Sequence, residues 1–181
     1  MKFILKTISY IVFFIAIFIA LLPKENLYFM GVKKLYREKI ELSQTSIVDN
    51  YFGLKIQNLN IKYENIDVAD ISKLDIATYI FSTKIDIRNI IVNSAFNKFA
   101  PQTIRSINIS HSILDPLKID ISSKFTQGEA KGYVDLLNRV IKIDIIVSRS
   151  FRSKYRQLTR VLKKVKNKDK KREYYSYEYK F

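Results

Sequence analysis

The first 23 residues contain the longest apolar stretch of the chain. Between Thr7 and Leu22 there are 16 consecutive uncharged residues, and eleven of them are Ile, Leu, Val or Phe. As a helix this run measures about 24 Å, and Phe3–Leu5 extend it toward the roughly 30 Å of a bilayer core if the Lys6 ammonium reaches the interface. We therefore expect a transmembrane anchor over residues 1–23. Its lipid-facing side chains are expected to include Ile8, Phe13, Phe14, Ile17, Phe18 and Leu21.

A cleaved signal peptide is the alternative interpretation of this run. No pair of small residues suited to cleavage precedes Pro23, because bulky Leu21 and Leu22 follow Ala20. We therefore favour an uncleaved anchor. More basic residues follow the run than precede it, which by the positive-inside rule favours a cytoplasmic C-terminus. Long C-terminal domains cross a membrane largely regardless of such charge, so the orientation stays open at this point.

After an amphipathic connector at residues 24–40, the chain alternates apolar and polar positions up to about residue 150. A four-residue pattern of Lys, an aliphatic residue, Asp and Ile begins at Lys73, Lys84, Lys118 and Lys142. This two-residue period places aliphatic side chains on one face of a strand and Lys and Asp on the other. The candidate groove-lining residues on the aliphatic face are Ile85, Ile87, Ile119, Ile121, Ile143 and Ile145.

Residues 41–150 therefore predict an antiparallel β domain, because short strands follow one another without a long helical pattern between them. No second apolar layer is apparent, so a sheet of about eight strands has to curve to shelter its apolar face, as a half-pipe or a flattened barrel. A change of phase between Ile56 and Leu59 predicts a β-bulge. The expected fold is mainly β, with an N-terminal transmembrane helix, a curved antiparallel sheet, a short basic C-terminal helix and a final edge strand.

The last segment, residues 151–181, is predicted to hold that basic helix and a Tyr-rich strand. Tyr155, Leu158, Leu162 and Val165 are spaced for one side of a helix over residues 154–166. The candidate contacts for an anionic partner are Arg152, Arg156, Arg160, Lys163 and Lys164. The helix has three open interpretations: a cap on the sheet with solvated lysines, a helix lying on anionic headgroups, or an element that binds a protein or nucleic acid. Alternating tyrosines then lead to Phe181 and predict the edge strand.

Net charge supports the division into a body and a basic appendage. The formal net charge is +15, yet residues 41–148 carry 12 basic and 12 acidic side chains. Residues 149–181 carry 13 basic and 3 acidic side chains. A dedicated nucleic-acid-binding domain usually presents its basic patch on the folded body. Nucleic acid is therefore a possible partner of the tail alone.

The composition argues against catalysis. The chain has no cysteine and one histidine, His111, which excludes thiolate and multi-histidine metal sites. Gly128 and Gly132 lack the spacing of a phosphate-binding loop. Asp67, Asp70 and Asp75 fall in alternating segments, where pairing with lysines in solvent is the simpler explanation. We expect no enzyme activity, no metal and no cofactor.

Several of these features together resemble a known family. The apolar anchor ends in Leu-Leu-Pro at residues 21–23, alternating strands follow, and Gly128 and Gly132 lead into Tyr-Val-Asp-Leu at residues 133–136. Arg139 then precedes the strand at residues 140–147. This arrangement resembles type II secretion system protein N and, more distantly, the AsmA-like family of periplasmic β-groove proteins.

The resemblance implies a single-pass inner-membrane protein whose β domain is periplasmic and has no enzyme activity. The first hypothesis is accordingly an accessory or assembly component of a type-II-secretion-like or DNA-uptake apparatus, acting through protein–protein contacts. The AsmA-like resemblance implies a second hypothesis, a groove that binds lipid. The basic tail supplies a third, contact with nucleic acid.

Overall fold

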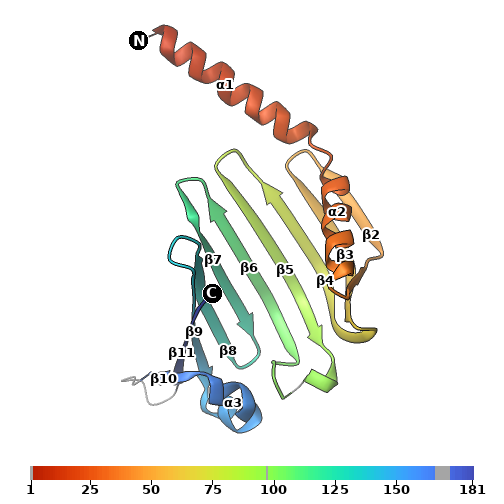
Figure 1. Ribbon diagram of the computed structural model, residues 1–181, viewed down its shortest axis with the longest axis vertical. Helices are drawn as coiled ribbons and strands as arrows, with labels where there is room; N and C mark the ends of the chain where they lie inside the picture. The colour runs from red at the N-terminus through yellow and green to blue at the C-terminus, as the bar shows by residue number, and fades with distance from the viewer. Residues whose placement is uncertain (1, 97, 166–171) are drawn as a thin grey trace.

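The computed structural model describes residues 2–96, 98–165 and 172–181 (Figure 1). The helices of this part of the chain are α1 (Lys2–Leu21), α2 (Lys24–Arg37), α3 (Arg149–Lys154) and α4 (Arg156–Val161), with a 3₁₀ turn at Ser94–Phe96. The strands are β1 (Ile40–Ser43), β2 (Ser46–Asn50), β3 (Gly53–Tyr63), β4 (Ile66–Thr78), β5 (Ser82–Val92), β6 (Thr103–Ser112), β7 (Asp115–Phe125), β8 (Gly128–Asp135), β9 (Val140–Ser148), β10 (Lys163–Val165) and β11 (Arg172–Lys180).

All of these strands belong to one antiparallel sheet, as the alternating pattern predicted. The order is β1-β3-β4-β5-β6-β7-β8-β9-β11-β10, and β2 pairs with β3 beside β1. Among the described strands, β1 and β10 lie at opposite ends of this order and do not pair with each other. The sheet is therefore open, and the flattened barrel is not formed.

The two faces of the sheet follow from its register, because residues directly opposite each other share a face. One row runs across neighbouring strands through Leu54, Ile76, Ile85, Ile109 and Ile121. We call the face that carries this row the inward face. The other face, the outward face, carries the lysines and aspartates between these residues.

The phase change predicted between Ile56 and Leu59 is present, but it is not the bulge of a single strand. Asn58 on β3, with φ 51°, lies between ladder pairs opposite Ser72 on β4, which in turn lies opposite Asn89 on β5, with φ 53°. Along this line the pairing changes register where β6 meets β7, around Arg105, and separate register shifts lie at Ile61–Lys62 between β3 and β4 and at His111–Ser112 between β6 and β7. The irregular positions form a line across β3, β4, β5 and β6. Because Asn58 interrupts the alternation of β3, Ile56 and Leu59 both face inward although they are three residues apart.

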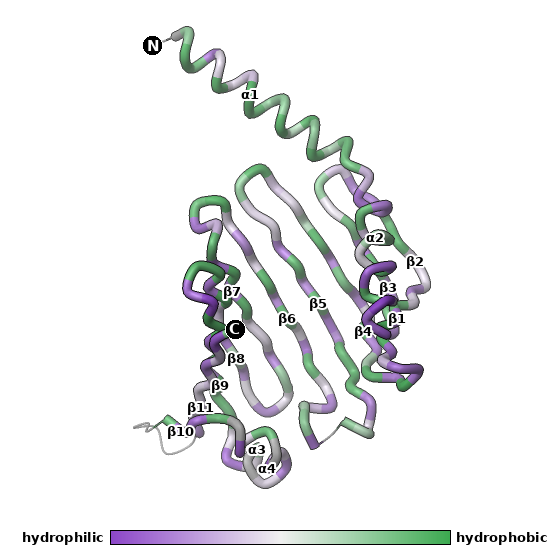
Figure 2. The backbone as a smooth tube through the Cα atoms, viewed as in Figure 1, coloured by the Kyte–Doolittle hydropathy of each residue, from purple (hydrophilic) through white to green (hydrophobic). Residues whose placement is uncertain are grey.

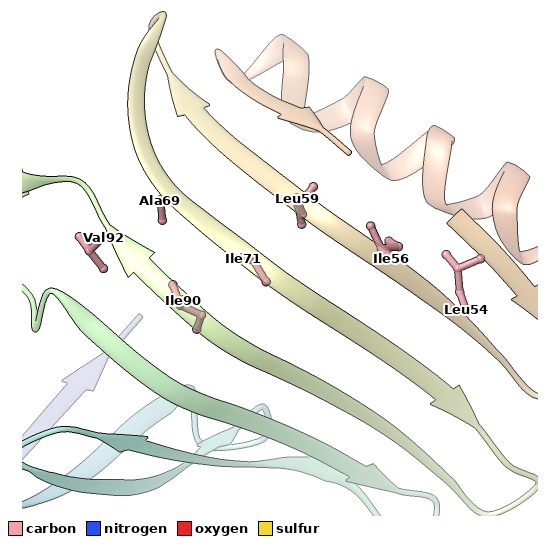
Figure 3. Close-up of a cluster of buried hydrophobic side chains, with 7 residues drawn as sticks. All are labelled: Leu54, Ile56, Leu59, Ala69, Ile71, Ile90 and Val92. Atoms are coloured by element: carbon pink, nitrogen blue, oxygen red, sulfur yellow. The ribbon is translucent and has the colours of Figure 1, made fainter. Parts of the chain in front are cut away.

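The first buried cluster lies on the inward face of β3–β5, with α2 over its β3 side and Phe96 and Ala100 also packed against it. Its members are Leu54, Ile56, Leu59, Ala69, Ile71, Ile90 and Val92 (Figure 3). Tyr28 of α2 packs against this cluster, and its hydroxyl donates a hydrogen bond to Gln44 Oε1 at 3.3 Å. Burial raises the pKa of Tyr28 above its ordinary value. The α2 helix therefore covers the apolar side chains at the β1–β3 end of the sheet.

A second cluster lies at the other end of the sheet and corrects the predicted C-terminal helix. Phe151, Tyr155, Val147 and Tyr175 are almost fully buried together, and the Phe151 and Tyr155 ring centroids are 4.7 Å apart. The prediction of a single helix over residues 154–166 is wrong. Tyr155 leaves helical geometry (φ −117°, ψ 51°) and separates the two short helices α3 and α4.

The chain then becomes extended at Leu162, where ψ is 137°, and residues 163–165 pair with β11 as strand β10. The prediction failed because pairing with a distant strand outweighed the local helical pattern. For the same reason β11 is not an edge along its whole length, since β10 covers Tyr174–Ser176.

The first helix, α1, extends away from the sheet (Figures 1 and 2). Over Phe3–Leu21 it is long and apolar enough to span a membrane, and none of this segment is buried within the protein. The predicted lipid-facing residues Ile8, Phe13, Phe14, Ile17, Phe18 and Leu21 are between 40% and 77% exposed. An apolar helix without protein cover is what single-pass anchoring requires.

Candidate functional site

The inward face is apolar along most of its width. Beside the row through Ile85, a second row passes through Leu74, Ile87 and Ile107, reaches the polar Ser123 on β7, and continues through Ala130 and Ile145. A third row, beyond the phase change, includes Leu59, Ile71, Ile90, Ile104, Phe125 and Val147. Apart from Ser123 on β7 and the glycines of β8, the side chains in these rows are apolar from β3 to β9.

The middle of this surface is only partly covered. The six predicted groove-lining residues all lie on the inward face, on β5, β7 and β9: Ile85, Ile87, Ile119, Ile121, Ile143 and Ile145. Each is half-buried, whereas Ile56 under α2 and Phe151 in α3 are 0% and 1% exposed. Helices cover the two flanks, and the strands between them keep an apolar face that has no second layer of described residues.

Strand β8 contributes small inward side chains to this surface. Its inward positions are Gly128, Ala130, Gly132 and Val134. A Cβ atom on Gly132 would lie 2.2 Å from the Lys142 carbonyl oxygen, and one on Gly128 would lie 2.2 Å from the Ile146 carbonyl oxygen. Glycine is required here because the backbone of β9 approaches β8 so closely.

The outward face is polar, and two of its four Lys–Asp repeats form ion pairs. Lys73 pairs with Asp75 at 3.1 Å and Lys118 pairs with Asp120 at 3.2 Å, in each case two positions along the same strand. The Ser176 hydroxyl donates to Asp144 Oδ1 at 2.7 Å across β9 and β11. The repeated Lys and Asp positions thus keep one face wet, and they offer no concentrated charge to a partner.

The predicted basic contacts are divided between different surfaces. Arg156 and Arg160 lie on α4 and, with Arg149 and Lys164, line a pocket of about 740 Å³ against β11. Lys164 Nζ is 2.7 Å from Glu173 Oε1, and the Tyr175 hydroxyl donates to Glu173 Oε2 at 2.7 Å. Arg152 lies within α3, and its side chain is outside the described part of the structure.

Lys163 does not join this pocket. On β10, Lys163 lies opposite Ser176 of β11 and Lys164 lies opposite Tyr175, so the two lysines point to opposite faces of the sheet. A helix would have placed both on one polar side, and the strand separates them. Three of the five predicted contacts, Arg156, Arg160 and Lys164, therefore share one pocket with Arg149, and Lys163 lies apart from them.

No group of three His, Asp or Glu side chains within the described residues is placed to hold a metal ion. His111 Nε2 donates to the Pro116 carbonyl oxygen at 3.0 Å in the β6–β7 hairpin. The backbone and side-chain amides of Asn138 donate to Asp135 in the β8–β9 turn and hold the pKa of that carboxyl below its ordinary value.

Two groups of residues at this site were not identified from the sequence. Phe125 and Phe151, whose ring centroids are 5.7 Å apart, form the far flank of the inward face, and only long-range contact brings them together. The other group comprises exposed apolar residues in the turns next to α1, such as Leu114, which is 88% exposed. In the sequence these residues could have been recognised as apolar residues at turn positions, where Gly, Asn and Asp are usual.

Comparisons with protein-family models, with curated proteins and with solved structures find no match.

Proposed function

We propose that this protein is a single-pass inner-membrane protein that acts by binding, as an accessory or assembly component of a type-II-secretion-like or DNA-uptake apparatus. The observation that carries the proposal is the half-buried apolar face over β5–β9, between flanks that are covered by helices. A monomer rarely leaves such a surface to water without a use for it. The family resemblance described above supplies the kind of apparatus and the periplasmic side.

The proposed shape of the binding domain is a half-pipe with the inward face as its lining. Figure 1 draws β4–β6 broad side on and β9 and β11 nearly edge on, which supports a bend across the sheet. The glycines of β8 support it too, because strand positions without side chains let neighbouring strands turn sharply. A trough of this kind would expose a long apolar lining to a partner while its outward face stays solvated.

Protein partners have a second point of contact in this proposal. Strand β10 pairs only with Tyr174–Ser176, so the outer edge of β11 from Tyr177 to Lys180 faces no other described strand. Free edges accept an added strand through main-chain hydrogen bonds. Strand addition at β11, together with burial of apolar side chains in the trough, is the proposed mechanism of assembly.

Lipid binding is the second candidate function, and one observation favours it. On β7–β9 the apolar lining continues to the end of the sheet near α1, where Ile119, Val134 and Ile141 lie side by side on the inward face, whereas the same row on β4–β6 consists of Thr78, Thr83 and His111. An acyl chain entering from the anchored side would meet aliphatic side chains along its path. This is the arrangement that the AsmA-like resemblance implies.

Photo-crosslinking separates the two candidates. We expect a photoreactive amino acid at Ile85, on the inward face, to crosslink in cells, whereas the same group at exposed Lys84, on the outward face of the same strand, should not. A protein adduct specific to position 85 supports the assembly function, and a lipid-mass adduct supports the second candidate. Equal yields at both positions would contradict an inward binding face.

The periplasmic orientation has its own test. Fusions at Phe181 with alkaline phosphatase and with green fluorescent protein report the side of the membrane on which the C-terminus lies. We expect an active phosphatase and a dark fluorescent protein, despite the basic residues after α1, because long C-terminal domains cross regardless of flanking charge. The reverse pair of results would place the domain in the cytoplasm and remove the proposed apparatus.

A further inference from the structure

The turns at one end of the sheet share an unusual composition. We call them the anchor-side rim: residues 51–52, 79–81, 113–114 and 136–139, which read Tyr-Phe, Tyr-Ile-Phe, Ile-Leu and Leu-Leu-Asn-Arg. Several of the side chains are strongly exposed, including Tyr51 at 79%, Leu114 at 88% and Leu137 at 71%. Arg139 carries the single charge within these four segments, and Asp115 and Asp135 stand directly beside two of them.

Hydrogen bonds place these turns side by side. The Thr78 amide donates to the Phe52 carbonyl at 2.7 Å, and the Ile113 amide donates to the Phe81 carbonyl at 3.0 Å. At the far side of the sheet the Leu136 amide donates to the Leu117 carbonyl at 2.8 Å. The rim is therefore one continuous line of turn tips, and Figure 2 colours most of it as hydrophobic.

The membrane helix leaves from the same end. Lys24, at the start of α2 and three residues after α1, pairs with Asp49 Oδ1 at 3.6 Å, beside the 51–52 turn. Figure 1 draws α1 departing from this end of the sheet. Because two residues link α1 to α2, the first turn of the rim lies next to the point where the chain leaves the bilayer.

The residue preferences of hairpin turns do not explain the apolar residues of the rim. Two-residue hairpin turns favour Asn, Asp and Gly, which adopt positive φ readily. At the opposite end, Glu64–Asn65 has positive φ at both positions, 50° and 65°, and Thr126–Gln127 is polar. That end has exposed apolar residues of its own, Tyr63 at 48% and Ile66 at 54% on either side of the 64–65 turn and Phe99 at 58% in the loop before β6, but its two-residue tips are polar.

We propose that the anchor-side rim is a peripheral membrane contact, with its apolar tips inserted into the interface of the bilayer that α1 spans. The tyrosines suit the headgroup level, where amphipathic rings accumulate, and the leucine tips suit the acyl boundary below it. Asn138 holds the β8–β9 turn by donating to both carboxylate oxygens of Asp135, at 2.8 and 2.7 Å, so Leu136 and Leu137 stay at the surface. The sheet thus stands upright on the membrane, fixed by α1 and by its own turns.

The absence of tryptophan from the chain makes the test direct. A single Leu114→Trp or Leu137→Trp substitution gives the full-length protein one fluorophore at a rim tip. Thr126→Trp, in an exposed turn at the opposite end, is the matched control. Each variant is placed in nanodiscs of phosphatidylethanolamine and phosphatidylglycerol, and α1 insertion is scored separately by resistance to alkaline extraction.

We expect both rim tryptophans to be quenched by lipids brominated on their acyl chains, at a depth of about 5–10 Å below the headgroups, and to resist aqueous acrylamide. Thr126→Trp should show the opposite behaviour. The proposal is overturned if the rim tryptophans are as accessible to acrylamide as Thr126→Trp while α1 is inserted. Protection from both quenchers would indicate a protein contact, and failure of α1 to insert would remove the premise; each of these also overturns it.

Discussion

A full-length protein carrying Phe14→Arg and Ile17→Arg is expected to leave the membrane fraction. The eleven strongly apolar residues of the anchor contribute roughly −3 to −7 kcal/mol to insertion, at about −0.3 to −0.6 kcal/mol each. An arginine near the centre of a transmembrane helix costs about 2.5–3.5 kcal/mol, so two of them offset the whole gain. The measurement is the fraction of protein that remains in the pellet after alkaline extraction.

The matched control is Phe14→Leu with Ile17→Leu, which keeps the same positions apolar and should stay in the pellet. If the arginine variant also stays there, α1 is not the membrane anchor. N-terminal sequencing of the mature wild-type protein completes the test, because a cleaved leader would yield a chain that begins after the apolar run.

The second large effect is expected at Gly132. Replacement by Ala places a Cβ atom 2.2 Å from the Lys142 carbonyl oxygen, so β9 has to move away from β8. Overpacking of this kind destabilises proteins by about 1–3 kcal/mol. We expect Gly132→Ala to lower the free energy of unfolding by that amount, measured by urea denaturation in detergent with circular dichroism at a β-sheet wavelength.

Gly31→Ala is the control for this prediction, since it makes the same chemical change in α2, where a Cβ atom would meet nothing within 4 Å. Alanine in a helix interior gains about 0.5–1 kcal/mol over glycine, so this variant should be as stable as the wild type or slightly more so. Equal destabilisation by both substitutions would contradict the close approach of β8 and β9.

Much of the sheet could be predicted because a strand writes its two faces directly into the sequence. The four Lys-aliphatic-Asp-Ile segments placed Ile85, Ile121 and Ile143 on a common face, and their cross-strand pairing confirms the placement. The phase change near Asn58 was also visible. Its extension through Ser72 and Asn89 could not be predicted, because the sequence of one strand does not show which neighbouring strands share its irregularity.

The tail was predicted less well, since its structure depends on distant partners. Tyr155 fits a helical stripe in sequence, yet its burial against Phe151 ends the first short helix there. Lys163–Val165 pair with residues that come after a stretch outside the described chain, and local propensity carries no information on such pairing. The rim could not be predicted for a related reason, because only the folded sheet brings its four turns together at one end.

An upright sheet limits what the basic tail can touch. Strand β9 leads from the rim at Val140 to Ser148, and nine extended residues measure about 30 Å. Arg156 and Arg160 follow that strand, so they stand several screening lengths above the headgroups, given a Debye length of about 8 Å in physiological salt. With the rim on the bilayer, we expect these arginines to be held out of reach of the lipid surface. Their anionic partner, if they have one, has to come from the aqueous compartment, about a membrane's thickness away from the anchor.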